Sequence, residues 1–215
     1  MVIKSTISVS ELNAYTKIPL EQSDDLNKIF ETENEYIFKL FRQRKLISGN
    51  RLYPYGKRFA NNAKQIQLYG MPTIHIEFCK RLQGTMTYFV KYKKLPGLDV
   101  RTFLEKNASE NLWKDLAKFL AALHDKGIFF RGIHLGNLLL LDNGEFTLLD
   151  FARVKFYKKS LSTKARIRNL QHMMDYRDDV DHFAAIGKEN FLKLYFEYAG
   201  LTEKQQQKIQ CKLFG

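Results

Sequence analysis

The strongest constraint on the fold of this chain lies between Asn137 and Asp150, whose oxygen-bearing side chains flank a β-hairpin pattern. Two mainly apolar stretches, residues 138–141 and 145–149, are joined by Asp142-Asn143-Gly144, and Asn-Gly between strands is a strong hairpin signal. Because a hairpin folds the chain back on itself, we expect Asn137 and Asp150 to lie close together. An amide oxygen and a carboxylate suit Mg²⁺, which takes few protein ligands besides water and phosphate oxygens.

The residues around this pair resemble the catalytic motifs of the protein-kinase superfamily. There, His-Arg-Asp is followed five positions later by Asn, and further along by Asp-Phe-Gly. This chain has Phe130-Arg131-Gly132, Asn137 and Asp150-Phe151-Ala152. Within the superfamily, the string Phe-Arg-Gly-Ile-His-Leu-Gly-Asn and the basic stretch after it look most like the lipopolysaccharide kinases. That group includes 3-deoxy-manno-octulosonate kinases, heptose kinases and toluene-tolerance proteins. The resemblance covers roughly residues 35–182.

The resemblance implies an α+β fold of the bilobal protein-kinase type. Residues 1–92 would form a lobe with a small antiparallel sheet, and residues 93–215 an abbreviated, mainly helical lobe of the same domain. It also implies ATP and Mg²⁺ as cofactors, with Asn137 and Asp150 binding the metal and the nucleotide. The implied acceptor is a sugar of the lipopolysaccharide core on lipid A, at the cytoplasmic side of the inner membrane.

Lys39 is the residue that the resemblance assigns to the α- and β-phosphates of ATP. It lies in the middle of residues 36–42, which have the pattern of a buried strand. Burying an unpaired ammonium group is costly, so a lysine at this position needs an explanation. Phosphate binding is one explanation. The alternative is that Lys39 lies on the solvent face of the strand together with Ile37 and Phe41.

A helix is predicted over residues 57–69, where protein kinases hold the glutamate that orients this lysine. The predicted helix contains no acidic residue. The amide oxygen of Asn61 or Asn62 is a neutral substitute, and the partner of Lys39 is left open.

Gly132 stands where kinases have the aspartate that accepts the proton of the acceptor hydroxyl. Loss of such a general base typically costs roughly 10²- to 10⁴-fold in rate. His134 titrates near neutral pH and is a candidate base, although a charge-stabilising or structural role also fits it. Arg131 is expected to make an ionic contact that anchors the following segment. Further candidates, which more often belong to a solvated helix face, are Asp175, Asp178, Asp179 and Asp181.

The net charge of +12 predicts an anionic partner. Seven basic residues and no acidic one occupy residues 153–168, directly after Asp150. A solvated charged loop is the alternative to a substrate site here. The residues expected to bind the acceptor are Arg153, Lys155, Lys158, Arg166 and Arg168. Nucleic acid is a disfavoured partner, because the chain has no nucleic-acid fold signature and no interleaved aromatic platform.

Length and composition fit this interpretation. A chain of 215 residues suits one bilobal domain. No run approaches the roughly 20 apolar residues of a membrane span, and residues 1–19 lack a signal-peptide core, so we expect a cytoplasmic protein that contacts the inner membrane only transiently. Three hypotheses remain: a lipopolysaccharide kinase, a pseudokinase that binds nucleotide or lipopolysaccharide-assembly partners without catalysis, and a nucleic-acid-binding module.

Overall fold

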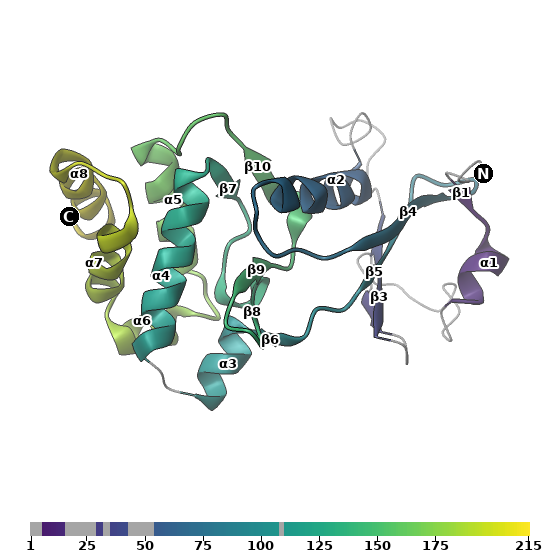
Figure 1. The fold of residues 1–215 in the computed structure, drawn as a ribbon, viewed down its shortest axis with the longest axis horizontal. Helices are drawn as coiled ribbons and strands as arrows, with labels where there is room; N and C mark the ends of the chain where they lie inside the picture. The colour runs from purple at the N-terminus through teal and green to yellow at the C-terminus, as the bar shows by residue number, and fades with distance from the viewer. Residues whose placement is uncertain (1–5, 16–28, 32–34, 43–53, 108–109) are drawn as a thin grey trace. The chain divides into compact units, whose positions relative to one another are not determined.

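The structure is a computed structural model that describes residues 6–15, 29–31, 35–42, 54–107 and 110–215. The chain divides into two compact units, Met1–Leu95 and Pro96–Gly215, whereas the sequence placed the boundary after residue 92. Each unit has its own helices and strands (Figure 1).

The N-terminal unit contains a five-stranded sheet in the order β1-β4-β5-β3-β2. All pairs are antiparallel except β1 with β4. The strands are β1 (Thr6–Ile7), β2 (Ile29–Glu31), β3 (Tyr36–Phe41), β4 (Ile76–Leu82) and β5 (Tyr88–Lys93), and the helices are α1 (Val9–Asn13) and α2 (Tyr55–Leu68). The small antiparallel sheet expected from the sequence is therefore present.

Strand β3 contributes side chains to both faces of this sheet, because successive residues of a strand point to opposite sides. Phe38 and Leu40 belong to one cluster with Leu12 of α1. On the other face, the ring of Phe41 lies 5.2 Å from the ring of Phe59 in α2. Helix α2 thus packs on the face that carries the odd-numbered residues of β3.

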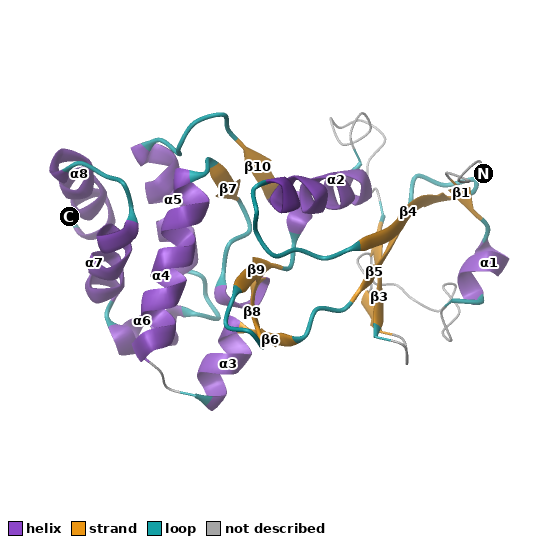
Figure 2. Cartoon of the chain, viewed as in Figure 1, coloured by secondary structure: helices purple, strands orange, loops and turns teal. Residues whose placement is uncertain are grey.

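The C-terminal unit is mainly helical, as expected (Figure 2). Its helices are α3 (Val100–Lys106), α4 (Glu110–Asp125), α5 (Thr163–Met174), α6 (Val180–Ile186), α7 (Lys188–Tyr198) and α8 (Glu203–Phe214). Its short strands are β6 (Gly97–Asp99), β7 (Ile128–Phe130), β8 (Leu138–Leu141), β9 (Phe146–Leu148) and β10 (Val154–Phe156). They form a three-stranded sheet in the order β6-β8-β9 and a separate pair of β7 with β10.

Strands β8 and β9 form the hairpin predicted from Asn143-Gly144. Leu138 pairs with Leu148, and the turn closes with a hydrogen bond from Gly144 N to Leu141 O. Gly144 has a φ of +83°, a conformation that glycine adopts at little cost. The local turn signal was therefore sufficient to predict this element.

The core of the C-terminal unit lies between α4, α6 and α7. The ring of Trp113 in α4 packs 5.2 Å from Phe183 and 5.8 Å from Phe191. Gly127 follows α4, and a side chain there would collide with two backbone oxygens of the loop between β10 and α5, both 2.4 Å from a Cβ at this position. No helix in the described part of the chain is long and apolar enough to cross a bilayer.

Candidate active site in the C-terminal unit

The loop between β7 and β8 brings Asn137 against the backbone of Gly132. The Asn137 side-chain nitrogen donates a hydrogen bond to the Gly132 carbonyl oxygen at 2.8 Å. Since the amide nitrogen is used in this way, the amide oxygen is the atom that faces other ligands. Asn137 is half-buried directly before β8, which limits the freedom of its side chain.

The hairpin then returns the chain to this loop. Leu149 N donates to Asn137 O at 2.9 Å, which holds Asp150 beside Asn137 in the chain fold. The Asp150 side chain is 23% exposed, and one of its oxygens lies 3.9 Å from Arg153 Nε. An amide oxygen and a partly exposed carboxylate at one edge of a hairpin are the donor types that Mg²⁺ takes together with water and phosphate oxygens. The pair thus fits a magnesium ion shared with a nucleotide.

Among the residues that the structure describes, no group of three His, Cys, Asp or Glu side chains is arranged to hold a metal ion. The Asn137 and Asp150 pair therefore suits a cation that keeps water or substrate oxygens as its remaining ligands.

Gly132 is buried next to this pair, in a place that has room for a small side chain. A Cβ at Gly132 would lie 3.1 Å from Arg153 Cδ and 3.7 Å from Asn137 Nδ2. The nearest atom belongs to a flexible side chain that is more than half exposed. The backbone therefore accepts a side chain here if Arg153 shifts by a few tenths of an ångström.

His134, the candidate base from the sequence, stacks on the ring of Tyr176. The ring centroids are 4.1 Å apart and the planes differ by 9°. Burial lowers the pKa of His134 below its ordinary value, an effect that the Asp179 carboxylate partly opposes. A neutral, stacked ring that is half-buried favours the structural role over the role of general base.

Asp179 also binds the loop between β7 and β8. Its carboxylate is fully buried and accepts hydrogen bonds from Leu135 N at 2.7 Å and from Arg101 Nε at 2.6 Å. The Arg101 guanidinium also lies against Gly136, where a Cβ would be 3.1 Å from Nη1. The sequence listed Asp179 among four further candidates for the base, for which a solvated helix face was the more common alternative, and it did not identify Arg101 as part of the site.

Arg166 was predicted to bind the acceptor, and the structure contradicts this prediction. Its guanidinium is fully buried and forms an ion pair with Asp125. The same group donates to Tyr195 Oη at 2.6 Å, to Leu161 O at 3.1 Å and to Ser160 Oγ at 2.8 Å. Every nitrogen of this side chain has a protein partner, so Arg166 stabilises the interior and does not contact an acceptor.

A chain of buried hydrogen bonds leads from Arg166 to β7, directly before the loop between β7 and β8. Asn169 Nδ2 donates to Phe130 O at 2.7 Å, so its oxygen accepts from His124 Nε2 at 3.2 Å. His124 Nδ1 then accepts from the Tyr195 hydroxyl at 2.8 Å, and this hydroxyl accepts from Arg166. The arrangement requires a neutral imidazole. Burial lowers the pKa of His124 to about 3, and burial raises the pKa of Tyr195 to about 12.

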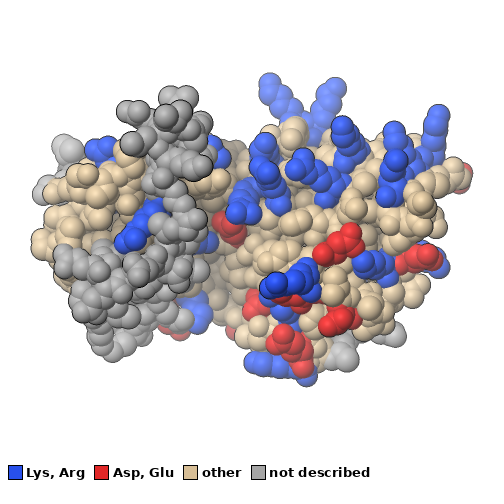
Figure 3. Space-filling view, turned by 180° about the vertical axis from the view of Figure 1, so that it is seen from behind, with Lys and Arg blue, Asp and Glu red and all other residues tan. Residues whose placement is uncertain are grey.

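The other predicted acceptor residues lie at the surface. Arg153, Lys155, Lys158 and Arg168 are all exposed. Lys and Arg side chains gather along the edge of this unit that carries the loop between β10 and α5 (Figure 3). Arg131 is also exposed, and it makes no salt bridge with the residues that the structure describes. Its backbone N–H donates to Arg153 O at 3.1 Å, so its main chain holds the following segment in place.

Lys39 belongs to the N-terminal unit, on the face of the sheet covered by α2. Its Nζ lies 4.9 Å from the ring centroid of Phe59 and 5.6 Å from that of Phe41. Phe41 is only 8% exposed, so the alternative with Lys39 and Phe41 on a solvent face is wrong. Asn62 is buried and Asn61 is exposed. That one of these amide oxygens is the partner of Lys39 stays a prediction.

Known protein structures share this architecture. No protein-family model and no curated protein sequence matches the chain. Solved structures of WbdD do match. A 2.2 Å crystal structure of WbdD is 15% identical over 89% of this chain and 49% of its own, with a TM-score of 0.50. A co-crystal structure of WbdD with a kinase inhibitor is 16% identical over 86% of this chain and 46% of its own, with a TM-score of 0.51. This chain has a kinase-like fold.

WbdD is described, in a further structure with a TM-score of 0.49, as a bifunctional kinase-methyltransferase. The present chain spans about half the length of these WbdD chains. At such low identity the likeness concerns the fold alone, so the chemistry has to be argued from the residues of this chain.

Proposed function

We propose that this protein transfers the γ-phosphate of ATP to a sugar hydroxyl of the lipopolysaccharide core. The observation that carries the proposal is the arrangement of Asn137 and Asp150 at the open end of the β8–β9 hairpin, where Leu149 N, next to Asp150, donates to Asn137 O and the Asn137 side chain donates to Gly132 O. Kinase-like folds use this pair to hold a nucleotide-bound cation.

Each residue of the proposed site has a distinct task. Mg²⁺, when bound, would neutralise charge on the nucleotide phosphates. The Asn137 amide oxygen and the Asp150 carboxylate would hold that ion. The resemblance to protein kinases assigns the α- and β-phosphates to Lys39 of the N-terminal unit. The kinase inhibitor in one WbdD complex supports a nucleotide-type site in this fold, and the assignment to the present chain rests on its own motifs.

The absence of a carboxylate at Gly132 is compatible with slow catalysis. Phosphoryl transfer passes through a loose transition state, in which positioning and charge stabilisation supply most of the rate enhancement. Arg153 lies beside both Gly132 and Asp150 and contributes a positive charge at the point where the acceptor would approach. A kinase without this base is expected to be slow, and its acceptor hydroxyl would lose its proton to solvent.

The lipopolysaccharide core is proposed as the acceptor because the basic edge of the C-terminal unit matches an anionic glycolipid. The exposed Arg153, Lys155, Lys158 and Arg168 follow Asp150 directly in the sequence. The same charges would favour transient contact with the anionic cytoplasmic face of the inner membrane.

Two measurements test this function. Mg-ATP should raise the melting temperature of the wild type and of Asp142→Asn, an exposed control in the hairpin turn, but not of Asp150→Asn. Transfer of labelled γ-phosphate to a truncated core saccharide should fall at least about 100-fold in Asp150→Asn, which corresponds to about 3 kcal/mol of transition-state stabilisation. Equal behaviour of both variants would contradict the proposal.

A pseudokinase is the second candidate, and Gly132 together with the stacked His134 favours it. In that case Mg-ATP would stabilise the wild type in a manner that depends on Asp150. No labelled phosphate would appear on core saccharide, lipid A precursor or a protein control.

A further inference from the structure

Two grooves lie side by side on the C-terminal unit and share Phe129, Arg131 and Arg168. The first, which we call the proximal groove, is also lined by Arg153, Asn169, Gln171, His172 and Asp175. The second, the basic groove, is also lined by Lys155, Tyr157, Ser162, Lys164 and Ala165. Their volumes are about 470 and 420 Å³, within the range of about 300–1,000 Å³ that is usual for small-molecule sites.

The proximal groove leads to the proposed active site. Arg153 lines it, and Arg153 Nε lies 3.9 Å from the Asp150 carboxylate. The groove also contains Asp175, whose charge is matched by an ion pair with Lys188. An acceptor sugar lying in the proximal groove would therefore have one end near the nucleotide-binding pair.

The basic groove has the chemistry of an anion site. Four cations converge on it, one from the residue that follows β7, one from β10 and two from α5, and the described residues that line it include no carboxylate. All four side chains are exposed. The cations are Arg131, Lys155, Lys164 and Arg168. The groove also reaches the first turn of α5, where Ser162 caps Ala165 N and the helix dipole adds a partial positive charge.

We propose that the basic groove binds a phosphate group already present on the acceptor saccharide, while the sugar that receives the new phosphate lies in the proximal groove. The proposal rests on the proposed function and narrows its substrate class to saccharides that carry an anionic substituent beyond the acceptor sugar. Arg131 and Arg168 line both grooves, so the two parts of one ligand would contact them together. Planar guanidinium groups suit phosphate oxygens, with which they form two parallel hydrogen bonds.

The test measures binding to the basic groove in the absence of nucleotide. ¹⁵N-labelled protein without nucleotide is titrated with glucose 6-phosphate, inorganic phosphate and glucose, and the backbone amide signals of residues 163–165 are followed. We expect saturable shifts with glucose 6-phosphate, weaker ones with inorganic phosphate and none with glucose. The double variant Lys155→Gln/Lys164→Gln should bind glucose 6-phosphate at least about tenfold more weakly, since it removes two charged hydrogen-bond donors from the groove.

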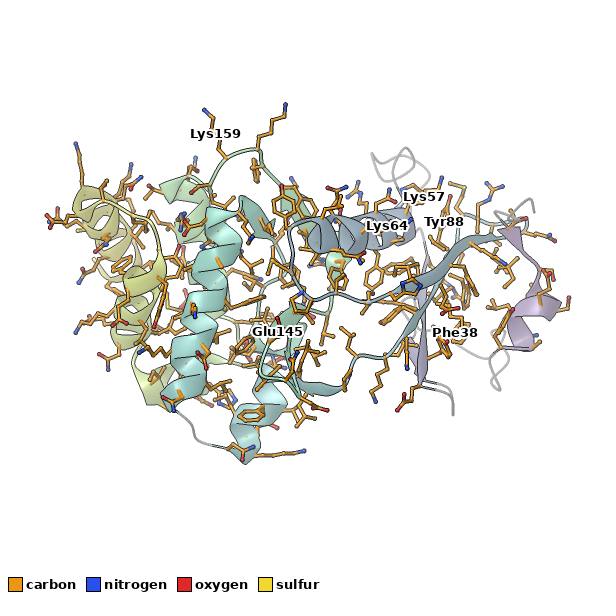
Figure 4. All side chains as sticks on the ribbon, viewed as in Figure 1. Phe38, Lys57, Lys64, Tyr88, Glu145 and Lys159 are labelled. Atoms are coloured by element: carbon orange, nitrogen blue, oxygen red, sulfur yellow. The ribbon has the colours of Figure 1, made fainter. Side chains whose placement is uncertain are left out.

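Lys159→Gln is the matched control. Lys159 belongs to the same basic segment and is exposed, but it lines neither groove and points away from the helices of the unit (Figure 4). The control should bind glucose 6-phosphate as the wild type does. Equal weakening in the control would overturn the proposal, because it would indicate general charge attraction. Absence of saturable shifts, or tighter binding of inorganic phosphate than of glucose 6-phosphate, would overturn it as well.

The two experiments distinguish failure of the basic-groove proposal from failure of the proposed kinase function. If Mg-ATP stabilises the protein through Asp150 but glucose 6-phosphate does not bind, the basic groove is not an acceptor site and the kinase function stands. If glucose 6-phosphate binds through Lys155 and Lys164 but Mg-ATP does not stabilise the protein, the groove remains a saccharide-phosphate site and the kinase function fails.

Discussion

The side chain of Asn137 donates a hydrogen bond to the backbone carbonyl of Gly132 at 2.8 Å. This bond uses only main-chain atoms of residue 132, so the loop keeps its shape although that residue has no side chain. The geometry that holds the amide proposed to bind the metal is therefore separate from the group that would accept a proton. A chain of this kind can lack the base and still keep the proposed metal ligands in place.

Restoring the carboxylate is the first prediction. Gly132→Asp should raise the rate of γ-phosphate transfer by roughly 100-fold, the lower end of the usual general-base effect. The side chain fits because the nearest obstacle is the flexible Arg153. Gly132→Asn is the control, with the same shape and no basic oxygen. Equal rates for the two variants in a labelled-phosphate assay would show that the missing base does not limit turnover.

The second prediction concerns Asp179, which anchors the loop between β7 and β8. Asp179→Asn should lower the free energy of unfolding by about 3 kcal/mol, because a buried carboxylate that binds Leu135 N and Arg101 is replaced by a neutral amide. Asp178→Asn is the neighbouring control. Asp178 is 43% exposed and lies 3.8 Å from Arg101, so its loss should cost less than about 1 kcal/mol. Urea unfolding measures both, and similar losses would contradict the anchoring role.

The third prediction is a dependence of stability on pH. The pKa of His124 is about 3 in the folded protein and about 6.5 when unfolded, so between these values only the unfolded chain binds the proton. The free energy of unfolding should therefore fall as the pH falls below about 6.5, by about 2 kcal/mol between pH 7 and pH 5 from this residue.

Urea unfolding at both pH values tests this dependence in the wild type, in His124→Gln and in His75→Gln. His75 is exposed and serves as the control. The loss between pH 7 and pH 5 should be about 2 kcal/mol smaller in His124→Gln than in the other two proteins. An equal loss in all three would mean that the imidazole is not held neutral.

The fourth prediction separates two arginines of the same helix. Arg166→Gln should destabilise the protein by about 3 kcal/mol, since it leaves Asp125 and Tyr195 without their charged partner. Arg168→Gln should change stability by less than about 0.5 kcal/mol, because the side chain is exposed. Thermal unfolding measures the first effect. Binding of glucose 6-phosphate should instead weaken in Arg168→Gln, and the reverse pattern would contradict the positions assigned to both residues.

The sequence by itself determined the local elements that place the candidate site. The Asn-Gly turn predicted the hairpin between Asn137 and Asp150, because the conformation of a two-residue turn depends on the residues within it. Leu112, Leu116 and Leu123 recur at helical spacing, a pattern that by itself predicts a helix, and α4 spans Glu110–Asp125. The small sheet and the mainly helical second unit were instead expected from the resemblance to protein kinases.

Tertiary structure alone decided which charged residues are available. Arg166 and Arg168 are two positions apart in one basic run, yet the first is fully buried and the second is exposed. Asp178 and Asp179 differ in the same way. Sequence patterns do not separate such neighbours, because burial depends on which face of a helix or turn meets elements distant along the chain. The packing of α4, α5 and α7 therefore assigned Arg166 to the interior and left Arg168 at the surface.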